Sequence, residues 1–428
     1  MRTGILALLL LAVPAFAADA PSDAEFLVEI KRKRVDELLP SAMRAHGVDL
    51  WLVFTREEAR DPLAADLGGG SAVARMALLF AETSDGFRKI AVAASYDVTP
   101  LEESEIYDQV VSYRSEGVKP HLKRIVDELR PSRIAVNTSR DMPIADGLTA
   151  GMRGYLVETL GDEAAARFVS SEPLVASFRG RRLKEEVRIL SEAAVYTDRI
   201  MREALASEVI QPGTTTENDV GDFLRKRAQE FGATVPFISV VAGPSRGHAR
   251  PSSRIIRPGD LVRIDFGITH RGYCTDIQRT AYVLRANESG PPAEIQKMWE
   301  TCRLAADNQI AAMRPGLTGN QIDAIGRKVL TDAGYKEPPH GSGHAIGFAV
   351  HDVGPLLGPD WPERYGSTVF LKLEEQQTFA VEPILYVDYE PAGGEIHIGL
   401  EEDVVITADG AERLHRRQDA LLLIGGVD

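Results

Sequence analysis

The sequence predicts an α+β protein in which a smaller α/β domain precedes a larger domain built from a duplicated unit. Short apolar stretches alternate with helical patterns from about residue 24 to 175, which indicates a small α/β domain. The segment "SSEPLVASFRGRR" (170–182) reads as a linker. After this segment, a Pro-Gly start followed by a helical pattern occurs twice. We therefore predict domains at 21–178 and 179–428, after an N-terminal segment (1–20) of different character.

The N-terminal segment has the features of a cleavable signal peptide. "MRTGILALLLLAVPAFA" combines a basic start, an apolar run and small residues at Ala15 and Ala17. Its apolar run is too short to cross a membrane. We expect cleavage after Ala17 or Ala20 and export to the periplasm or beyond, with no membrane attachment. A buried N-terminal helix is the alternative.

The overall charge bears on the class of partner. The chain has 428 residues, 44% of them hydrophobic, and a formal net charge of −14. An acidic chain has no surplus of basic side chains to neutralise phosphates, which argues against nucleic acid as a partner.

The duplication appears in two helical segments that each begin with Pro-Gly, "PGTTTENDVGDFLRKRAQEFG" and "PGLTGNQIDAIGRKVLTDAGY". Arg225 and Gly232 recur as Arg327 and Gly334, at an offset of 102 residues. Chance similarity of two capped helices is the alternative. A duplicated α+β unit would pack as two related halves with a site between them.

A predicted hairpin, "LVRIDFGITHRGYCTDIQRT" (261–280), places two carboxylates together. If the turn is centred on His270 and Arg271, Asp265 faces Asp276 directly. Like charges that face each other across a sheet are destabilising. Buried carboxylates can remain ionised when a cation lies between them, so the hairpin indicates a cation site.

Further metal-binding side chains follow the repeat helices. His340, His344 and His351 fall within twelve residues, and the 102-residue offset takes His248 to a position next to His351. The acidic candidates in strand-like contexts are Glu382 and Glu402. Two Asp, two Glu and one His suit two divalent ions such as Mn²⁺, Co²⁺ or Zn²⁺, rather than a structural zinc. Two ions about 3.5 Å apart can hold a bridging hydroxide and polarise a carbonyl.

Each of these residues also has an ordinary structural explanation. Either aspartate alone is more often a turn or edge carboxylate, His340 could be a loop residue, and Glu382 could be an ion-pair partner. His46 and His121, in the first domain, are read as surface or cap residues. The combination, rather than any single residue, favours a metal site.

The combined motifs resemble the pita-bread metallopeptidases (family M24), which include methionine aminopeptidase, aminopeptidase P and prolidase. The matching stretches are "GDLVRIDFG…GYCTDIQRT", "PHGSGHAIGFAVHDVG", "VEP" and "EED". The resemblance is closest to Xaa-Pro aminopeptidase and prolidase. It implies a duplicated pita-bread catalytic domain after a creatinase-type N-terminal domain, and a homodimer.

The resemblance also implies roles for individual residues. Its five metal ligands fall on Asp265, Asp276, His344, Glu382 and Glu402. Asp276 and Glu402 would bridge two ions, most simply Mn²⁺, with Co²⁺ or Zn²⁺ as alternatives. The implied catalytic residues are Glu382, which would also transfer a proton, His351 and His248. The implied substrate-binding residues are His340, His248 and His351.

The sequence departs from the family pattern near two of the glutamates. The common Arg two residues before the last Glu ligand is replaced, in this alignment, by Leu400. Ile384 stands where Gly is usual after "EP", and Ser245 where Asn is common. The choice of Glu402 over Glu401 rests on the Glu-Asp dipeptide and on strand parity with Glu382.

The expected function is metal-dependent exopeptidase activity that hydrolyses the N-terminal peptide bond of Xaa-Pro peptides. Both the aminopeptidase and the dipeptidase type remain open. The alternatives are a non-peptidase enzyme on the same fold, and an exported protein that binds metal with little or no turnover.

Overall fold

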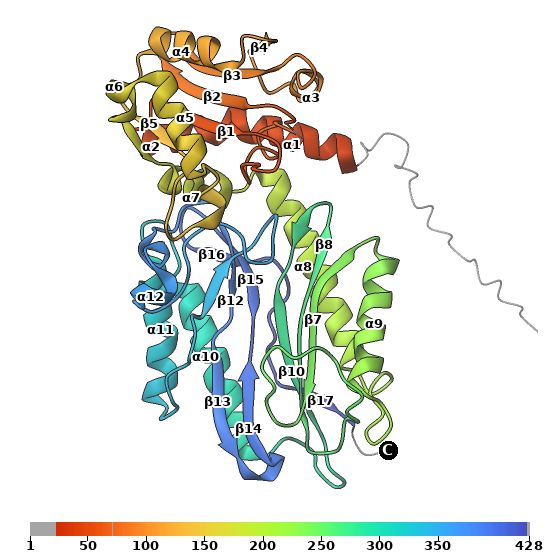
Figure 1. The fold of residues 1–428 in the computed structure, drawn as a ribbon. Coiled ribbons are helices and arrows are strands. Elements are labelled where there is room, and N and C mark those ends of the chain that lie inside the picture. The colour runs from red at the N-terminus through yellow and green to blue at the C-terminus, as the bar shows by residue number, and fades with distance from the viewer. Residues whose placement is uncertain (1–22, 71, 426–428) are drawn as a thin grey trace, which may run out of the picture.

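The computed structural model describes residues 23–70 and 72–425. The predicted signal peptide, 1–20, lies outside the described residues. The two parts of the chain are stacked end to end, with the N-terminal part at the top of Figure 1. Both mix helices and strands, which confirms the predicted α+β class.

The N-terminal part is a six-stranded sheet in the order β4-β3-β2-β1-β5-β6. Its central strand, β1, is buried along its whole length because apolar clusters cover both faces of the sheet. Strands β1 to β3 pair antiparallel, whereas β4, β5 and β6 each join a parallel neighbour. The elements are α1 (Asp23–Glu37), α2 (Leu39–Ala45), β1 (Leu50–Thr55), β2 (Met76–Thr83), β3 (Gly86–Ala94), α3 (Thr99–Glu103), β4 (Gln109–Tyr113), α4 (Val118–Leu129), β5 (Ile134–Val136), α5 (Ala150–Leu160), α6 (Asp162–Ala165) and β6 (Phe168–Ser170).

The predicted linker is wrong in its secondary structure, because most of it forms the helix α7 (Glu172–Gly180). Pro173 occupies the first turn, where its missing N–H costs nothing. All residues from Leu174 to Gly180 are buried. The segment is therefore a packed connection between the two parts of the chain.

The C-terminal part confirms the predicted duplication. Helices α9 (Glu217–Glu230) and α11 (Gly319–Asp332) both have 14 residues and begin after a threonine N-cap. Thr216 forms a capping box with Asp219, and Thr318 forms one with Gln321. The remaining helices and strands are α8 (Lys184–Ala204), β7 (Thr234–Ala242), β8 (Leu261–His270), β9 (Tyr273–Cys274), β10 (Ile277–Val283), α10 (Ala293–Ala312), β11 (Gly343–Ala345), α12 (Pro362–Tyr365), β12 (Thr378–Val381), β13 (Ile384–Tyr389), β14 (Gly394–Gly399), β15 (Glu402–Ile406), β16 (Ala411–Arg413) and β17 (Leu422–Ile424).

Each repeat contributes three neighbouring antiparallel strands. The first repeat supplies β7-β8-β10, extended by β17, and the second supplies β11-β12-β15, extended by β16. A separate ribbon, β13-β14, packs beside β8 and β10. The long helices α8 to α11 lie on the outside of these strands (Figure 1). Polar residues on the inner strand faces can therefore meet between the two repeats.

The predicted hairpin forms, but its register differs from the prediction. Asp265 pairs with Gln278 rather than with Asp276. The two-residue turn is Arg271–Gly272, with φ of 50° and 85°. A turn with two positive φ values matches the twist of a hairpin and accepts Gly readily, whereas a turn at His270–Arg271 would not use Gly272. Asp276 therefore lies diagonally across from Asp265, on the same face.

Buried charges join the N-terminal part to the C-terminal part. Arg34 of α1 pairs with Glu186 of α8 at 2.7 Å, and both side chains are buried. The Tyr273 hydroxyl donates to the same glutamate at 2.8 Å. One hydrophobic cluster also continues from α1 and β1 through α7 and α8 to β8. The two parts therefore share a core.

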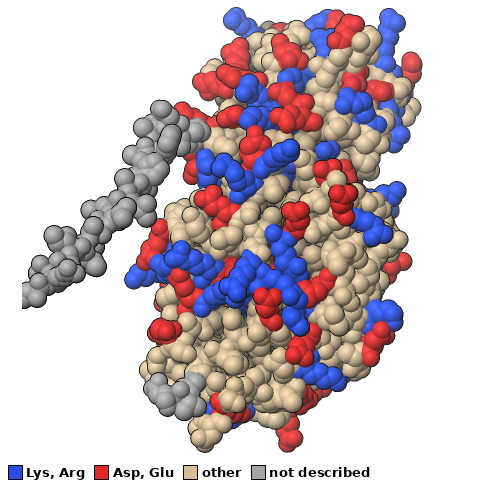
Figure 2. Space-filling model, turned by 180° about the vertical axis from the view of Figure 1, so that it is seen from behind, with Lys and Arg blue, Asp and Glu red and all other residues tan. Residues whose placement is uncertain are grey.

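The described surface carries charges of both signs. Figure 2 shows Lys and Arg interspersed with Asp and Glu over one face of the molecule. Within the described part of the chain, no helix combines the length and apolar character needed to cross a membrane.

Candidate metal centre and active site

The first repeat supplies two buried aspartates. Asp265 lies on β8, and Asp276 lies between β9 and β10. They are 4% and 5% exposed. Gly267, between them in the hairpin, has no room for a side chain, because a Cβ would come within 2.1 Å of the Thr275 carbonyl oxygen. This close approach of the two strands brings the aspartates together.

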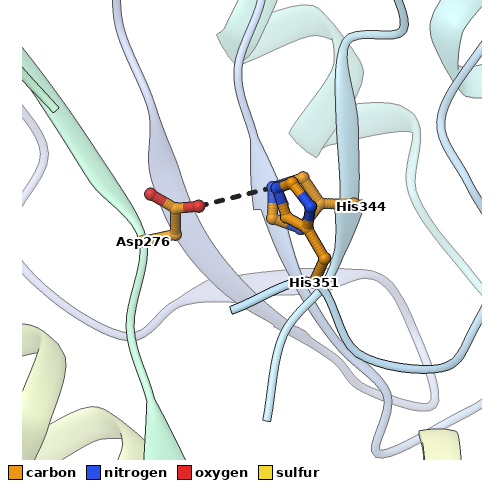
Figure 3. Close-up of side chains that lie close together, drawn as sticks. All are labelled: Asp276, His344 and His351. Atoms are coloured by element: carbon orange, nitrogen blue, oxygen red, sulfur yellow. Dashed lines mark ion pairs between the residues drawn. The ribbon is translucent and has the colours of Figure 1, made fainter. Parts of the chain in front are cut away.

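The second repeat supplies His344 and Glu382. His344 on β11 faces Ala380 of β12, two residues before Glu382, so both side chains occupy one face of the sheet. His344 Nε2 lies 3.4 Å from Asp276 Oδ2 and 3.8 Å from Glu382 Oε1. Figure 3 shows Asp276 and His344 pointing toward each other from the two sheets. Side chains from the two repeats thus meet at the interface between them.

The structure turns the fifth predicted ligand, Glu402, away from the cluster and places Glu401 there instead. Val381 of β12 pairs with Glu402, so the residue opposite Glu382 is Glu401. The prediction assumed that an even-numbered residue on β15 shares a face with Glu382. In the observed register the residue numbers of paired positions on β12 and β15 add up to an odd number, so an odd-numbered residue lies opposite Glu382. Glu402 points to the other face, 3.4 Å from Arg279, 3.6 Å from Arg413 and 3.7 Å from His415. It is a structural ion-pair residue.

With Glu401 in the cluster, the position at which the family commonly has Arg is also a different residue. The residue two positions before Glu401 is Gly399, not Leu400, which lies in the core. A Cβ at Gly399 would come within 1.7 Å of Gln278 Oε1. The space beside Gly399 is therefore filled by Gln278, and a larger side chain there would require Gln278 to move.

Three overlapping groups of side chains place their ligand atoms within 4.8 Å of one another. One is Asp265, Asp276 and Glu401; another is His344, Glu382 and Glu401; the third is Asp276, His344 and His351. Asp276, His344 and Glu401 each belong to two groups. The three groups therefore form one continuous cluster that could hold metal.

The electrostatics of the cluster favour a cation. Burial and the neighbouring Asp265 hold the pKa of Asp276 well above its usual range, and burial with Asp276 does the same to Glu401. Burial raises the pKa of Glu382 to about 7. Asp276 Oδ1 and Glu401 Oε2 are buried and have no hydrogen-bond partner among the described residues. Unpaired carboxylate oxygens beside an imidazole fit hard or borderline divalent ions.

The other predicted histidines surround this cluster. His248 Nδ1 lies 3.0 Å from Asp265 Oδ2, which raises the pKa of His248. His351 packs its ring 4.2 Å from the ring of His344 (Figure 3), and this neighbour lowers the pKa of His351 to about 4. His340 Nε2 lies 3.3 Å from the Tyr386 hydroxyl.

Three residues beside the cluster were not among the predicted site residues. Asp403 is fully buried, and its Oδ2 accepts from the Asp276 amide at 3.3 Å. Arg263 lies on the same face of β8 as Asp265 and donates to it at 3.2 Å. His397 lies on β14 and contacts Ser245. Strand alternation from Asp265 could have identified Arg263, whereas Asp403 and His397 depend on long-range pairing.

A cavity of about 580 Å³ opens beside His248. Residues of β7, including Phe237 and Ser239, form one wall, and Arg225 and Arg250 also line it. It offers room for a peptide next to the candidate site.

The sequence was compared with known protein families. The model of metallopeptidase family M24 matches residues 188–408, more than half of the chain. The chain belongs to metallopeptidase family M24. This family is metal-dependent, as its name states, and its matched segment contains every residue of the three groups described above.

Sequence relatives of this M24 chain carry dipeptidase names, and solved structures with a similar fold carry dipeptidase and aminopeptidase names. An Xaa-Pro dipeptidase from Pyrococcus furiosus is 30% identical over 287 residues, covering 64% of this chain and 75% of that protein. Dipeptidase PepE from Mycobacterium ulcerans has a TM-score of 0.69 at 23% identity, over 93% and 98% of the two chains. An X-Pro aminopeptidase from Thermotoga maritima has a TM-score of 0.63 at 21% identity, over 91% and 99%. These solved structures confirm the predicted fold across both parts of the chain.

Proposed function

We propose that this M24 protein is a dinuclear metal-dependent exopeptidase that hydrolyses the first peptide bond of Xaa-Pro peptides. The observation that carries the proposal is the convergence of Asp265, Asp276, Glu382, Glu401 and His344 between the two repeats. We expect Mn²⁺ in this site, with Co²⁺ or Zn²⁺ as alternatives. When bound, two such ions would supply an activated water and polarise the peptide carbonyl.

Side chains of this protein would transfer the proton and bind the substrate. The Glu382 side chain is 20% exposed, against 6% and 7% for Asp265 and Asp276, so it is the carboxylate that an incoming peptide meets. We assign to it the transfer of a proton to the departing amine. His248 and His351 are both exposed at the edge of the cluster, where they can donate hydrogen bonds to the substrate.

His340 is assigned to the substrate pocket. Its Nδ1 faces the Gly341 carbonyl oxygen at 2.7 Å, and a carbonyl can only accept, so this nitrogen carries the ring proton. Nε2 then accepts from the Tyr386 hydroxyl. These two contacts fix the orientation of the His340 ring.

The proposal includes export and self-association. Residues 1–20 would be removed on export to the periplasm or beyond, leaving a chain that starts close to α1. A homodimer is expected from the family resemblance. N-terminal sequencing of the protein isolated from its native host, and sedimentation of the purified protein, would test these two points.

The proposed activity is tested with a small panel of peptides and Mn²⁺. The panel contains Xaa-Pro dipeptides, Xaa-Pro-Yaa peptides and matched peptides without proline, each with and without a chelator. Chelator-sensitive release of the first residue, confined to Xaa-Pro substrates, would support the proposal. Release independent of proline would contradict the specificity. No release by protein that holds its metals would instead favour the alternative, a metal-binding protein without peptidase turnover.

A further inference from the structure

A short aromatic segment of the second repeat lies against the loop that carries His340. We call residues 359–367 the α12 segment, because they contain the four-residue helix α12. Figure 1 shows α12 beside α11, just below the N-terminal part. Within the segment, the rings of Trp361 and Tyr365 stack with centroids 5.8 Å apart and planes 11° apart. Neither ring belongs to the metal cluster, so the contacts of the segment must explain its position.

The His340 loop lacks the backbone donors that would hold it in place. It reads "EPPHG" (337–341) and lies outside the helices and strands. Pro338 and Pro339 have no backbone N–H. The carbonyl oxygens of a packed loop still need hydrogen-bond donors. Side chains from other segments must therefore supply them.

Two arginines supply these donors. Arg327 of α11 donates to the Pro338 carbonyl oxygen at 2.7 Å and also to the His340 carbonyl oxygen. Arg364 of α12 donates to the Pro339 carbonyl oxygen. A guanidinium presents several N–H donors in one plane, so it can bind more than one carbonyl oxygen. Three consecutive carbonyl groups of the loop are thus held by α11 and α12.

The arginines are themselves held by neighbouring side chains. Arg327 Nε donates to Asp323, and these two side chains are 9% and 1% exposed. The Arg327 guanidinium lies 5.2 Å from the centroid of the Trp361 ring. The Arg364 guanidinium lies 5.6 Å from the Trp361 centroid and 5.1 Å from the Tyr365 centroid. The stacked rings therefore orient both cations that bind the loop.

Tyr365 holds the peptide group that follows His340. Gly341 is buried, and its amide donates to the Tyr365 hydroxyl oxygen at 2.8 Å. The carbonyl oxygen of the same peptide group accepts from Arg327. The Gly341 carbonyl oxygen lies 2.7 Å from Nδ1 of the His340 ring. The backbone on both sides of His340 is therefore held, and with it the direction of the imidazole.

The α12 segment is fastened at its far end to the N-terminal part and to α7. The Ser367 amide donates to Asp141 Oδ2 at 2.7 Å, and the Ser367 hydroxyl donates to Glu172 Oε1 at 2.9 Å. Gly366 has a φ of 53°, and a Cβ there would come within 2.3 Å of the Asp141 carboxyl carbon. A helix of four residues has little stability of its own. These contacts and the stacked rings therefore fix the segment against the His340 loop.

We propose that Tyr365 and Arg364 are positioning residues that act through His340 and set the place of its imidazole in the substrate pocket. This inference rests on the proposed function, which assigns His340 to that pocket. Among the described residues, neither side chain contacts a candidate metal ligand. A substrate-binding group that is held before and during the reaction contributes mainly to KM. Loss of either positioning contact should therefore raise KM more than it lowers kcat.

The kinetic test is a double-mutant cycle on the full-length, Mn²⁺-loaded protein. The wild type, Tyr365→Phe, His340→Ala and the double variant are compared on the best Xaa-Pro substrate of the panel. Tyr365→Phe should raise KM by about 10-fold and change kcat by less than about 2-fold. In the His340→Ala background the same substitution should change KM by less than about 2-fold, because the group that it positions is gone. Equal effects in both backgrounds would overturn the proposal.

Further variants separate positioning from a general effect on the fold. Arg364→Met removes the donor to the loop and should raise KM in the same His340-dependent way. Tyr113→Phe is the matched control, because its hydroxyl bonds the Arg75 carbonyl oxygen in the N-terminal part at 2.7 Å. This control should leave KM unchanged, and an equal rise in KM would overturn the proposal. So would an unchanged KM in both α12 variants when His340→Ala raises it.

A crystal structure of Tyr365→Phe makes the inference independent of turnover. Compared with a crystal structure of the wild type, the His340 ring should be displaced or occupy two positions, with the metal ions unchanged. An unmoved His340 ring would overturn the proposal even if no peptide in the panel is cleaved. A displaced ring in a protein that cleaves no peptide would support the positioning contacts and contradict the proposed function alone.

Discussion

Arg182, just before α8, donates to the carboxylate of Asp352, the residue after His351, at 2.8 Å. Both side chains are at most 1% exposed. Arg179 at the end of α7 donates to the other oxygen at 3.0 Å. The same carboxylate accepts from the Phe348 amide at 2.8 Å. Asp352 thus connects the junction of the two parts of the chain to the loop that carries His351.

Removing this carboxylate should cost stability. In Asp352→Ala, two buried guanidinium groups lose their shared anion, which we expect to lower the free energy of unfolding by about 3–5 kcal/mol. Urea denaturation would measure it. Asp332→Ala, which breaks an exposed pair with Lys328, is the matched control and should change stability by less than about 1 kcal/mol. Similar small effects in both variants would contradict the structural role of Asp352.

Adjacent glutamates should behave differently on substitution. Glu401→Gln should reduce bound metal and activity together, because Glu401 faces the cluster. Glu402→Gln should retain metal but lower the free energy of unfolding by about 3–5 kcal/mol, because Arg279 and Arg413 lose a buried anion. Elemental analysis and denaturation of the two variants give both quantities. The reverse pattern would restore Glu402 as the ligand.

His351 should act on the substrate rather than as an indispensable ligand. It is exposed, whereas His344 beside it is buried. We expect His351→Ala to keep its metal content and to lose about 10²–10⁴-fold in kcat, the scale of a positioned hydrogen-bonding or acid–base group. Steady-state kinetics and elemental analysis decide this together. Loss of metal from this variant would make His351 a ligand, and normal turnover would make it structural.

Metal binding should stabilise the protein measurably. If the folded cluster binds Mn²⁺ as proposed and the unfolded chain does not, the free energy of unfolding should rise by about 2.7 kcal/mol at a free metal concentration of 100 Kd. Thermal unfolding before and after chelation would show this as a reversible change in Tm. Asp276→Asn should abolish the response. An equal response in that variant would exclude Asp276 from the metal site.

A buried carboxylate in the N-terminal part should make stability depend on pH. Burial raises the pKa of Asp61 from 3.8 to about 6, although Asn137 and the Leu63 amide donate to it. The folded state therefore binds this proton more tightly than the unfolded state. Its contribution, about 2–3 kcal/mol, is present below about pH 4 and is lost as the pH rises through about 6.

Comparing the wild type with Asp61→Ser across that pH range isolates this contribution. The stability of the wild type relative to the variant should decrease as the pH rises. A difference that stays constant with pH would mean that Asp61 titrates normally in the folded protein.

Local patterns predicted much of the fold and the site. The repeated Pro-Gly, threonine and glycine positions marked α9 and α11, because capping and positive φ depend on adjacent residues. Asp265, Asp276, His344 and Glu382 were chosen correctly as members of one cluster. What failed depended on register. Turn geometry sets the register of the hairpin, in which Asp265 pairs with Gln278 instead of Asp276. Packing across the sheet sets the register of β12 and β15, which places Glu401 rather than Glu402 opposite Glu382.

The missed residues show the same limit. Arg263 and His397 are separated by 134 positions along the chain, and the turn at 245–247 that connects them comes from a third segment. No local pattern reveals such a connection. Likewise, the polarity of "SSEPLVASFRGRR" suggested an exposed linker, but Arg179 and Arg182 are buried against carboxylates from distant parts of the chain, Asp66 and Asp352.

The pairing of Arg34 with Glu186 limits how this protein can evolve. A recombination event that exchanged the N-terminal part alone would leave Glu186 and the Tyr273 hydroxyl facing a foreign helix. Arg179 would also lose its ion pair with Asp66. Such a chimera would carry uncompensated charge in its core. The N-terminal and C-terminal parts should therefore not be exchangeable one at a time without loss of stability.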